Sequence, residues 1–139
     1  MNIDSISNGY VIDHITAGKS MEIYRLLGLA GTDIPVALIT NCASSKMGRK
    51  DIMKIDADIE LDLDVIGFVD PDVTVSVIRD SKCVEKLTLA LPERLVNVVK
   101  CKNPRCITTI EQELDQCFRL TNRAEKVYRC EYCETKAEF

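Results

Sequence analysis

The chain has 139 residues, of which 46% are hydrophobic and 29% are charged, so its composition is that of a globular protein and excludes intrinsic disorder. No apolar run approaches the ~20 residues that cross a bilayer, and the first residues lack the basic start and apolar stretch of a signal peptide. We therefore expect a cytoplasmic protein. The formal net charge of −4 argues against a strong binder of nucleic-acid polymers.

The first part of the chain alternates strand-like and helix-like segments. Residues 10–15 are rich in β-branched side chains and predict a strand. Apolar residues at helical spacing predict a helix over 19–27, with Gly28 as its stop. The remaining predicted elements are strands at 35–42 and 50–56, a weaker helix at 62–68, and strands at 72–79 and 84–91. This order indicates an α+β fold, a ferredoxin-like antiparallel sheet with two helices on one face.

A domain boundary is expected near Pro92, because proline ends the strand pattern and a cysteine-rich segment follows. Residues 1–92 carry 9 basic and 14 acidic side chains, whereas residues 93–139 carry 9 and 8. We therefore expect two domains, 1–92 and 93–139, with different roles. The second is predicted to be small, all-β and zinc-ribbon-like, with strands at 107–110, 117–120 and 126–129 and a turn at 121–124.

Four of the seven cysteines form two close pairs, Cys101 with Cys106 and Cys130 with Cys133, and 23 residues separate the pairs. Because disulfides are disfavoured in the cytosol, clustered cysteines there indicate metal or redox chemistry. The C-x4-C and C-x2-C spacings let four thiolates converge on one Zn²⁺. Four thiolates leave no open coordination position. The sequence therefore predicts one structural zinc per chain, which supplies folding free energy that a segment of ~40 residues lacks.

Other interpretations of the cysteines are weaker. A thioredoxin-like role for Cys130 and Cys133 needs a strand before the motif and a long helix after it, and such a helix is not expected here. Cys117 is a competing metal ligand, although its apolar surroundings favour a buried thiol. Cys42 and Cys83 have no close cysteine partner, so packing is the default expectation for both.

The sequence shows no convincing catalytic constellation. The one histidine, His14, follows Asp13 in an expected strand, so the two side chains should point to opposite faces and form no charge relay. The acidic stretch 56–64 is interpreted as a solvated face, with a cation site as the weaker alternative. We therefore favour a binding module over an enzyme.

Two pairs of lysines stand out in this acidic part of the chain. Lys50 and Lys54 are four apart on an expected strand and therefore share a face, as do Lys82 and Lys86. Such a pair suits a polyphosphate or a ribose, although by composition alone simple solvation is the commoner reason for it. The lysines by themselves leave both interpretations open.

Four patterns follow one another along the chain. They are Gly9-x-Val11-Ile12-Asp13-His14-Ile15, Met47-Gly48-Arg49-Lys50-Asp51-x-x-Lys54-Ile55, Leu91-Pro92-Glu93-Arg94-x-x-Asn97-Val98, and the four cysteines. In order and spacing they resemble the regulatory chain of aspartate carbamoyltransferase, over essentially the whole sequence. The resemblance implies a non-catalytic subunit of an enzyme in pyrimidine biosynthesis.

The resemblance also implies ligands and partners. The N-terminal domain would be an allosteric domain that binds the nucleoside triphosphates CTP and ATP, with UTP and Mg²⁺ as a further candidate combination. The zinc domain would dock on the catalytic chain. Regulatory chains of the family pair as homodimers through their allosteric domains and bridge two catalytic trimers. No nucleic-acid polymer and no membrane would be involved.

The family's effector contacts fall on matching positions here. By resemblance, Asp13 lies at the ribose–phosphate end, His14 and Lys86 contact the triphosphate, and Lys54 reaches ribose and base. Lys50 corresponds to a lysine near a second nucleotide or a metal-bridged phosphate. Backbone contacts to the base are expected around Ile3, Asp4, Ser5 and Ile6, and in the stretch with Ile78, Ser81 and Cys83. Ser81 and Ser76 depart from the aromatic residue and the asparagine that are common in the family.

In the second domain the resemblance places contacts to the catalytic chain on the metal-binding loops. The candidates are Asn103, Arg105, Glu131, Tyr132 and Glu134. The alternative function is a stand-alone zinc-ribbon module that binds nucleic acid or protein. A net charge of only +1 over residues 93–139 counts against nucleic acid.

Overall fold

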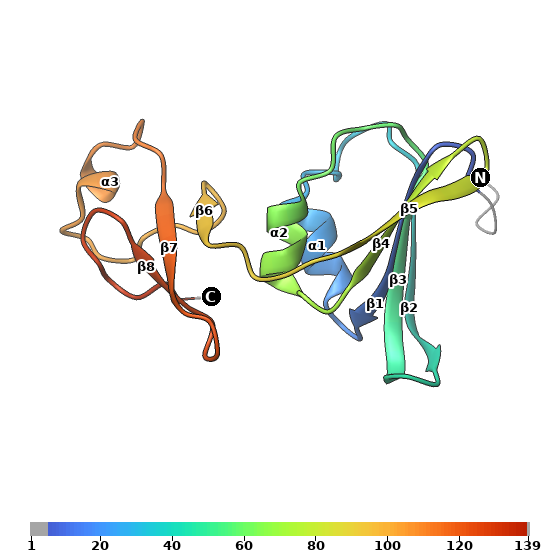
Figure 1. Cartoon of the computed structure of the whole chain (residues 1–139). Coiled ribbons are helices and arrows are strands. Elements are labelled where there is room, and N and C mark those ends of the chain that lie inside the picture. The colour runs from blue at the N-terminus through green and yellow to red at the C-terminus, as the bar shows by residue number, and fades with distance from the viewer. Residues whose placement is uncertain (1–5, 139) are drawn as a thin grey trace. The chain divides into compact units, whose positions relative to one another are not determined.

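The computed structural model describes residues 6–138 and divides the chain into two compact units, with the break between Ala90 and Leu91 (Figure 1). Each unit contains its own sheet, five-stranded in the first and three-stranded in the second. The two units are described separately below.

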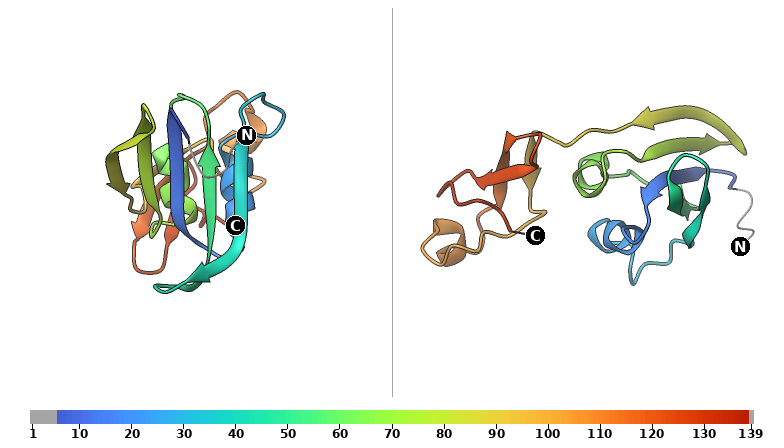
Figure 2. Two further views of the ribbon diagram at one scale, coloured as in Figure 1. Left: turned by 90° about the vertical axis from the view of Figure 1, so that its right-hand side faces the viewer. Right: turned by 90° about the horizontal axis from the view of Figure 1, so that it is seen from below.

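The first unit is a twisted antiparallel sheet with two helices on one face (Figure 2). Its elements are β1 (Gly9–Thr16), α1 (Ser20–Leu26), β2 (Val36–Ser44), β3 (Gly48–Ile55), α2 (Leu63–Val69), β4 (Thr74–Arg79) and β5 (Lys82–Thr88). The strand order is β2-β3-β1-β4-β5. The predicted ferredoxin-like α+β arrangement is confirmed, with β5 as an additional strand at the edge beside β4.

Backbone conformation and hydrogen bonds fix the end of α1 and the start of α2. After α1, Gly28 adopts a φ of +70°, a conformation that glycine tolerates best, and its N–H donates to the Arg25 carbonyl. At the start of α2, the Asp62 carboxylate accepts a hydrogen bond from the Val65 N–H at 3.2 Å, which satisfies one of the free donors of the first turn.

The core lies between the helices and one face of the sheet. Ile12 on β1 is directly opposite Met53 on β3 and Val75 on β4, and all three side chains are fully buried. Ile23 and Ile66 reach them from α1 and α2, where they are also fully buried. Burial of side chains of this size contributes about 1.5–3 kcal/mol each. Because side chains alternate along a strand, the residues between these positions lie on the open face of the sheet.

A buried carboxylate joins three parts of this unit. Asp51 on β3 is fully buried, and its Oδ2 accepts hydrogen bonds from the N–H of Gly18 (3.0 Å) and from the N–H and hydroxyl of Ser20 (3.3 and 2.7 Å). Its Oδ1 accepts from the Asn41 N–H at 2.8 Å, at a bulge in β2. Burial acts to raise the pKa of Asp51, but these hydrogen bonds outweigh it and hold the pKa below the ordinary value.

The second unit is built around a small sheet. It contains β6 (Arg94–Val96), α3 (Ile107–Ile110), β7 (Cys117–Asn122) and β8 (Val127–Cys130), and the strand order is β6-β7-β8. Leu95, Phe118 and Cys130 lie opposite one another and are each at most 1% exposed, so they form its core.

Two local predictions for this unit are wrong. Residues 107–110 form the short helix α3 and not a strand, because the metal-binding loop before them continues as a turn in which the Thr109 N–H donates to the Cys106 carbonyl. The β-branched residues that favour a strand have no neighbouring strand to pair with there. The predicted turn at 121–124 is displaced, since β7 continues to Asn122 and the turn spans 123–126.

Candidate metal centre and effector face

Four cysteine sulfurs converge in the second unit. Cys101 and Cys106 border the loop before α3, Cys130 ends β8, and Cys133 lies in the turn after it. All four Sγ atoms lie within 4.8 Å of one another, and two of the separations are 3.5 Å (Cys101–Cys133) and 3.7 Å (Cys106–Cys130). A tetrahedral metal with metal–sulfur bonds of ~2.3 Å needs sulfurs about 3.8 Å apart. The donor set therefore fits a closed tetrahedral four-thiolate centre.

Neighbouring polar side chains hold the two metal-binding loops in place. The Asn103 amide donates to the Thr135 hydroxyl at 3.3 Å, which joins the loop of Cys101 to the loop of Cys133. The Thr109 hydroxyl donates to the Asn103 carbonyl at 2.8 Å, and the Thr108 hydroxyl lies 3.1 Å from the Cys106 sulfur. Such outer contacts orient ligands and tune their basicity. The sequence analysis did not identify Thr108, Thr109 or Thr135, although each lies within three residues of a cysteine of the centre.

Burial of the thiols is uneven, and so is their acidity. Cys106 and Cys130 are each 1% exposed, whereas Cys101 and Cys133 are half-buried. Burial raises the pKa of the Cys101 thiol to about 12 and also raises the pKa of Cys130. Burial acts in the same direction at Cys133, but hydrogen bonds from Thr135 outweigh it and lower that pKa to about 6. Binding of a metal by all four thiolates must therefore displace protons.

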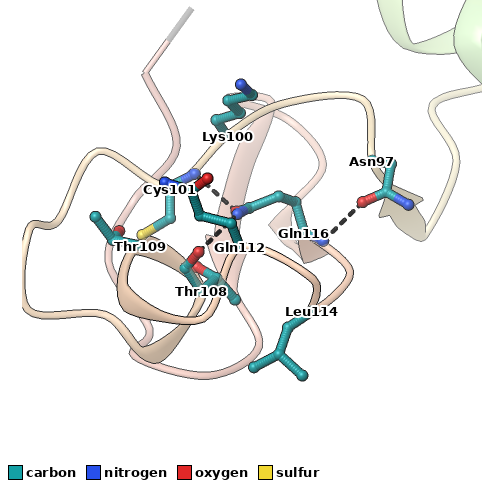
Figure 3. A pocket seen from close by; sticks show the side chains of 8 residues that line it. All are labelled: Asn97, Lys100, Cys101, Thr108, Thr109, Gln112, Leu114 and Gln116. Carbon is teal, nitrogen blue, oxygen red and sulfur yellow. Dashed lines mark hydrogen bonds between the residues drawn. The ribbon is translucent and has the colours of Figure 1, made fainter.

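A pocket beside Cys101 belongs to the same centre (Figure 3). Gln116 spans it: its Oε1 accepts from the Cys101 N–H at 3.0 Å, and its Nε2 donates to the Thr108 carbonyl at 3.4 Å. The Gln116 N–H in turn donates to Asn97 Oδ1 at 2.8 Å. Gln116 thereby fixes the backbone of one candidate ligand relative to α3.

The other three cysteines lie outside the four-sulfur group. Cys117 on β7 is buried, as expected for a packing residue. Cys42 on β2 is half-buried, with its sulfur 3.2 Å from the Lys50 carbonyl. Cys83 is exposed, so the expectation that it packs in the interior is wrong. The reason is that β5 forms an edge of the sheet and is largely solvent-exposed.

The open face of the first unit carries the lysines singled out in the sequence. In the pairing of β3, β1, β4 and β5, Lys54 is opposite Val11, Val11 is opposite Ser76, and Ser76 is opposite Lys86. The row is displaced by one residue along each strand from the row that contains the fully buried Ile12. Because side chains alternate between the two faces of a sheet, it faces away from the helices. With strands about 4.8 Å apart, Lys54 and Lys86 start about 14 Å from each other.

Asp13 and Lys50 lie further along the same face. The Lys50 ammonium is 2.9 Å from Asp13 Oδ1, and the His14 N–H donates to the same oxygen at 2.6 Å. Burial acts to raise the pKa of Asp13, but the Lys50 and His14 hydrogen bonds outweigh it, so the pKa is lowered. Four of the predicted effector contacts therefore lie on one face of the sheet: Asp13, Lys50, Lys54 and Lys86.

The strand is not regular at His14. A bulge shifts the β1 register between Ile12 and Ile15, and His14 has a φ of +60°. Ile12 and Ile15 are both fully buried although they are three residues apart. The regular alternation from which we expected Asp13 and His14 on opposite faces is therefore interrupted. In the described part of the chain, His14 Nδ1 is buried without a hydrogen-bond partner.

The remaining predicted effector contacts surround the β4–β5 turn. Ile78 is paired with Cys83 across this hairpin, and Ser81 donates its N–H to the Ser7 carbonyl at 2.9 Å. Ile6, next to Ser7, is buried. The other predicted backbone positions, residues 3–5, lie outside the described residues.

Comparisons with known proteins bear on both units. Residues 1–90 match the family described as aspartate carbamoyltransferase regulatory chain, allosteric domain, and residues 93–139 match the metal binding domain of the same chain. The chain belongs to this family. It is 49% identical over 134 residues to the aspartate carbamoyltransferase regulatory chain of Clostridium botulinum strain Hall, covering 96% of this chain and 92% of the relative. The regulatory chain of Bifidobacterium longum is 44% identical over 138 residues, 99% of each chain.

Membership of the family confirms several expectations from the sequence. The protein is a regulatory chain of aspartate carbamoyltransferase, a non-catalytic subunit with an allosteric and a metal-binding domain, and pyrimidine biosynthesis is the implied pathway. None of the described helices is long and apolar enough to cross a membrane.

The candidate contacts of the regulatory chain with its catalytic partner lie in different settings. Arg105 and Glu134 are exposed, and Tyr132 is 47% exposed. Asn103 has its side chain occupied within the metal-binding loops, with Oδ1 accepting from the Arg105 N–H at 3.0 Å. Glu131 is paired with the Arg94 guanidinium at 2.8 and 3.3 Å.

Two carboxylates of the acidic stretch 56–64 have partners within the described structure. Asp58 pairs with Arg79 at 2.9 Å, and Asp62 is the N-cap of α2. These contacts agree with the interpretation of the stretch as a solvated face.

Proposed function

We propose that this regulatory chain binds nucleoside triphosphate effectors on the open face of its first unit and passes their effect to catalytic trimers through its metal-bound second unit. CTP and ATP are the proposed effectors, and UTP with Mg²⁺ is a further one. The two proposed domains are residues 1–92 and 93–139. The chain is proposed to pair as a homodimer through its first domain. The complex is proposed to act in the cytoplasm.

The observation that carries the effector site is the row of Lys54 and Lys86 on one open face, with Lys50 and Asp13 beside it. A triphosphate needs several cations at once, and lysine supplies a mobile point charge on a flexible stem. The unpartnered, buried Nδ1 of His14 adds a group that a phosphate oxygen would satisfy if it is protonated. Ser76, between Val11 and Lys86, supplies a hydroxyl for the sugar or phosphates.

The proposed metal is one Zn²⁺ bound by Cys101, Cys106, Cys130 and Cys133. Support comes from the match to a metal-binding domain and from the convergence of four thiols at tetrahedral spacing. A closed four-thiolate site is structural, so the zinc would hold the second unit in the shape that docks on the catalytic chain.

Effector binding is tested by calorimetric titration of the zinc-loaded chain with CTP and ATP. We expect Lys86→Ala to weaken CTP binding about tenfold, the effect of losing ~1.4 kcal/mol of a charge-assisted contact. Lys46→Ala is the matched control, since Lys46 is exposed in the turn before β3 and lies off this face. Equal affinities of the wild type and Lys86→Ala would contradict the proposed site.

Regulation is tested in the complex with catalytic trimers. A ligand shifts an equilibrium between two states only by its different affinity for them, so a regulatory effector must displace the aspartate saturation curve. A curve that is unchanged by CTP, by ATP and by UTP with Mg²⁺ would contradict the regulatory role.

A further inference from the structure

The chain leaves the first unit over a glycine in the middle of α2. Gly67 is buried, and glycine destabilises the interior of a helix relative to alanine because it loses more conformational freedom on folding. Its surroundings explain why it is there. A Cβ atom at this position would lie 2.5 Å from the Ala90 carbonyl oxygen and 3.7 Å from Leu89 Cβ. Glycine therefore lets the last residues of the first unit lie directly against α2.

The chain is held again as soon as it enters the second unit. Three successive carbonyl oxygens accept hydrogen bonds there, from donors on β7, on β8 and in the turn between them. The Leu91 carbonyl accepts from the Arg123 guanidinium at 2.8 Å, and the Pro92 carbonyl accepts from the Tyr128 hydroxyl at 2.6 Å. The next carbonyl, that of Glu93, accepts from a backbone N–H of β7 at 2.8 Å.

These contacts leave a single residue between the segments that the two units hold. A peptide group is planar, so contacts at the carbonyls of Ala90 and Leu91 each fix one peptide plane. Only the φ and ψ angles of Leu91 lie between these two planes. The next residue is Pro92, whose ring restricts the residue before it to extended backbone conformations. Leu91 is therefore a short joint with limited freedom.

Tyr128 is the most firmly placed of the side chains that hold residues 91–93. Its side chain is fully buried, so packing fixes the position of its hydroxyl. Its carbonyl accepts from the Ala137 N–H at 2.8 Å, which ties its backbone to the end of the chain. The Arg123 side chain, in contrast, is exposed and can adapt its position. Tyr128 is therefore the group that determines where the Pro92 carbonyl lies in the second unit.

We infer that Leu91 is the joint between the two units, and that Pro92 and Tyr128 are positioning residues that keep this joint stiff enough to transmit the effect of a bound effector. The inference rests on the proposed function, because it takes effector binding by the first unit and docking of the second as given. An effector acts only through its different affinity for two states of the complex. A flexible joint adds conformations that are open in both states, and these carry no difference between the states.

The test uses the zinc-loaded full-length chain, free and in complex with catalytic trimers. Pro92→Ala together with Tyr128→Phe (P92A/Y128F) widens the freedom of the joint and removes its buried donor, and neither substitution touches a proposed effector or metal contact. We expect the displacement of the aspartate saturation curve by CTP or ATP to fall at least about twofold, the lower end of what substitutions that alter coupling produce. Effector affinity by calorimetry and assembly by size-exclusion chromatography should match the wild type.

NMR relaxation measures the joint without the catalytic chain. In the free wild-type chain we expect the ¹⁵N order parameters of Leu91 and Glu93 to be near the rigid value of about 0.85. In P92A/Y128F they should fall below about 0.6, while those of β7 and β8 stay unchanged. A second variant, with Gly-Gly inserted between Ala90 and Leu91, lengthens the joint and keeps the contacts on both sides. It should reduce the displacement of the saturation curve in the same way.

The matched control is Pro71→Ala together with Tyr10→Phe (P71A/Y10F). It also replaces a proline by alanine, and it also removes a tyrosine hydroxyl that donates to a backbone carbonyl at 2.6 Å, from Tyr10 to Ile59. Both substitutions lie within the first unit, away from the joint. The control should therefore keep the full displacement by effectors.

The results distinguish this inference from the proposed function. If effectors displace the curves of P92A/Y128F and of the Gly-Gly variant as far as that of the wild type, the inference is overturned and the proposed function stands. The same holds if the control loses as much as P92A/Y128F, or if the wild-type order parameters of Leu91 and Glu93 are below about 0.6. A wild-type curve that no effector displaces overturns both.

Discussion

The sharpest consequence of the fold concerns Asp51, the buried carboxylate that joins β3 to the turn before α1 and to the bulge of β2. Asp51→Asn keeps the shape of the side chain but replaces one oxygen by an NH₂ group. If the remaining oxygen serves Gly18 and Ser20, the new NH₂ faces the Asn41 N–H. At least one donor is then left unsatisfied, and the remaining bonds lose their charge.

The size of the effect follows from these four bonds. A hydrogen bond to a charged group contributes about 1.5–3 kcal/mol, and an unsatisfied buried donor costs about 1–3 kcal/mol. We expect Asp51→Asn to lower the free energy of unfolding of the first unit by about 2–4 kcal/mol. Asp58→Asn is the control: Asp58 also pairs with a cation, but its side chain is 68% exposed, and such a surface pair contributes at most ~1 kcal/mol.

The difference between wild type and Asp51→Asn should also depend on pH. The pKa of Asp51 is lowered in the folded state, so the unfolded chain takes up a proton first as the pH falls. The stabilisation is therefore fully present above the ordinary carboxyl value of 3.8 and is lost as the pH falls further, through the lowered folded value. The two stability curves should be parallel at neutral pH and converge in strong acid.

Urea unfolding of the zinc-loaded chain at several pH values measures the free energy of unfolding. Amide NMR signals from each unit separate the transition of the first unit from that of the second. If Asp51→Asn lowers the free energy of unfolding by less than about 1 kcal/mol at pH 7, Asp51 is not the main polar group that stabilises the first unit. A difference that grows on acidification would refute the sign of its pKa shift.

Three other outcomes are expected. Chelation of zinc, or Cys106→Ser, should unfold the second unit and release the chain from catalytic trimers while the β1–β5 signals persist, as measured by NMR and size-exclusion chromatography. Gln116→Ala should weaken zinc binding about tenfold or more in a competition titration, because it frees the Cys101 backbone. Lys50→Ala should raise the pKa of Asp13 in an NMR titration, since it removes the ammonium 2.9 Å from Oδ1.

The sequence predicted the first unit well because its signals are local. The alternation of residues 72–79 and the apolar spacing of 19–27 each correspond to an element, β4 and α1. The bulge at His14 was not predicted, because it depends on pairing with β3, and its trace in the sequence is only the three-residue spacing of Ile12 and Ile15. The β-branched residues of Val11-Ile12-Asp13-His14-Ile15 predict a strand, and this propensity does not show where its alternation is interrupted.

In the second unit the spacing of the cysteines predicted which residues come together, and propensity predicted β7 and β8 but failed for one segment between the cysteines. Residues 107–110 are β-branched, yet they form a helix because the loop at Cys106 determines their direction. The second layer of the centre, Thr108, Thr135 and Gln116, was missed for a related reason. Threonine and glutamine are common at surfaces, and only the three-dimensional contacts distinguish these residues from others of their type.

The sheet register determines where the basic residues of each unit gather. The first unit is acidic overall, but its cations gather on the open face of the sheet, where Lys54 and Lys86 are in one row and Lys50 lies further along. The second unit is almost neutral, but its cations line up across β6, β7 and β8. In both units the sheet register brings basic residues that are scattered in the sequence into one row, and in the first unit this row supports the proposed binding of a triphosphate. If the chain acts as proposed, an effector bound to the first unit alters catalysis only through its different affinity for two states of the complex, a difference that the second unit must transmit to the catalytic chain.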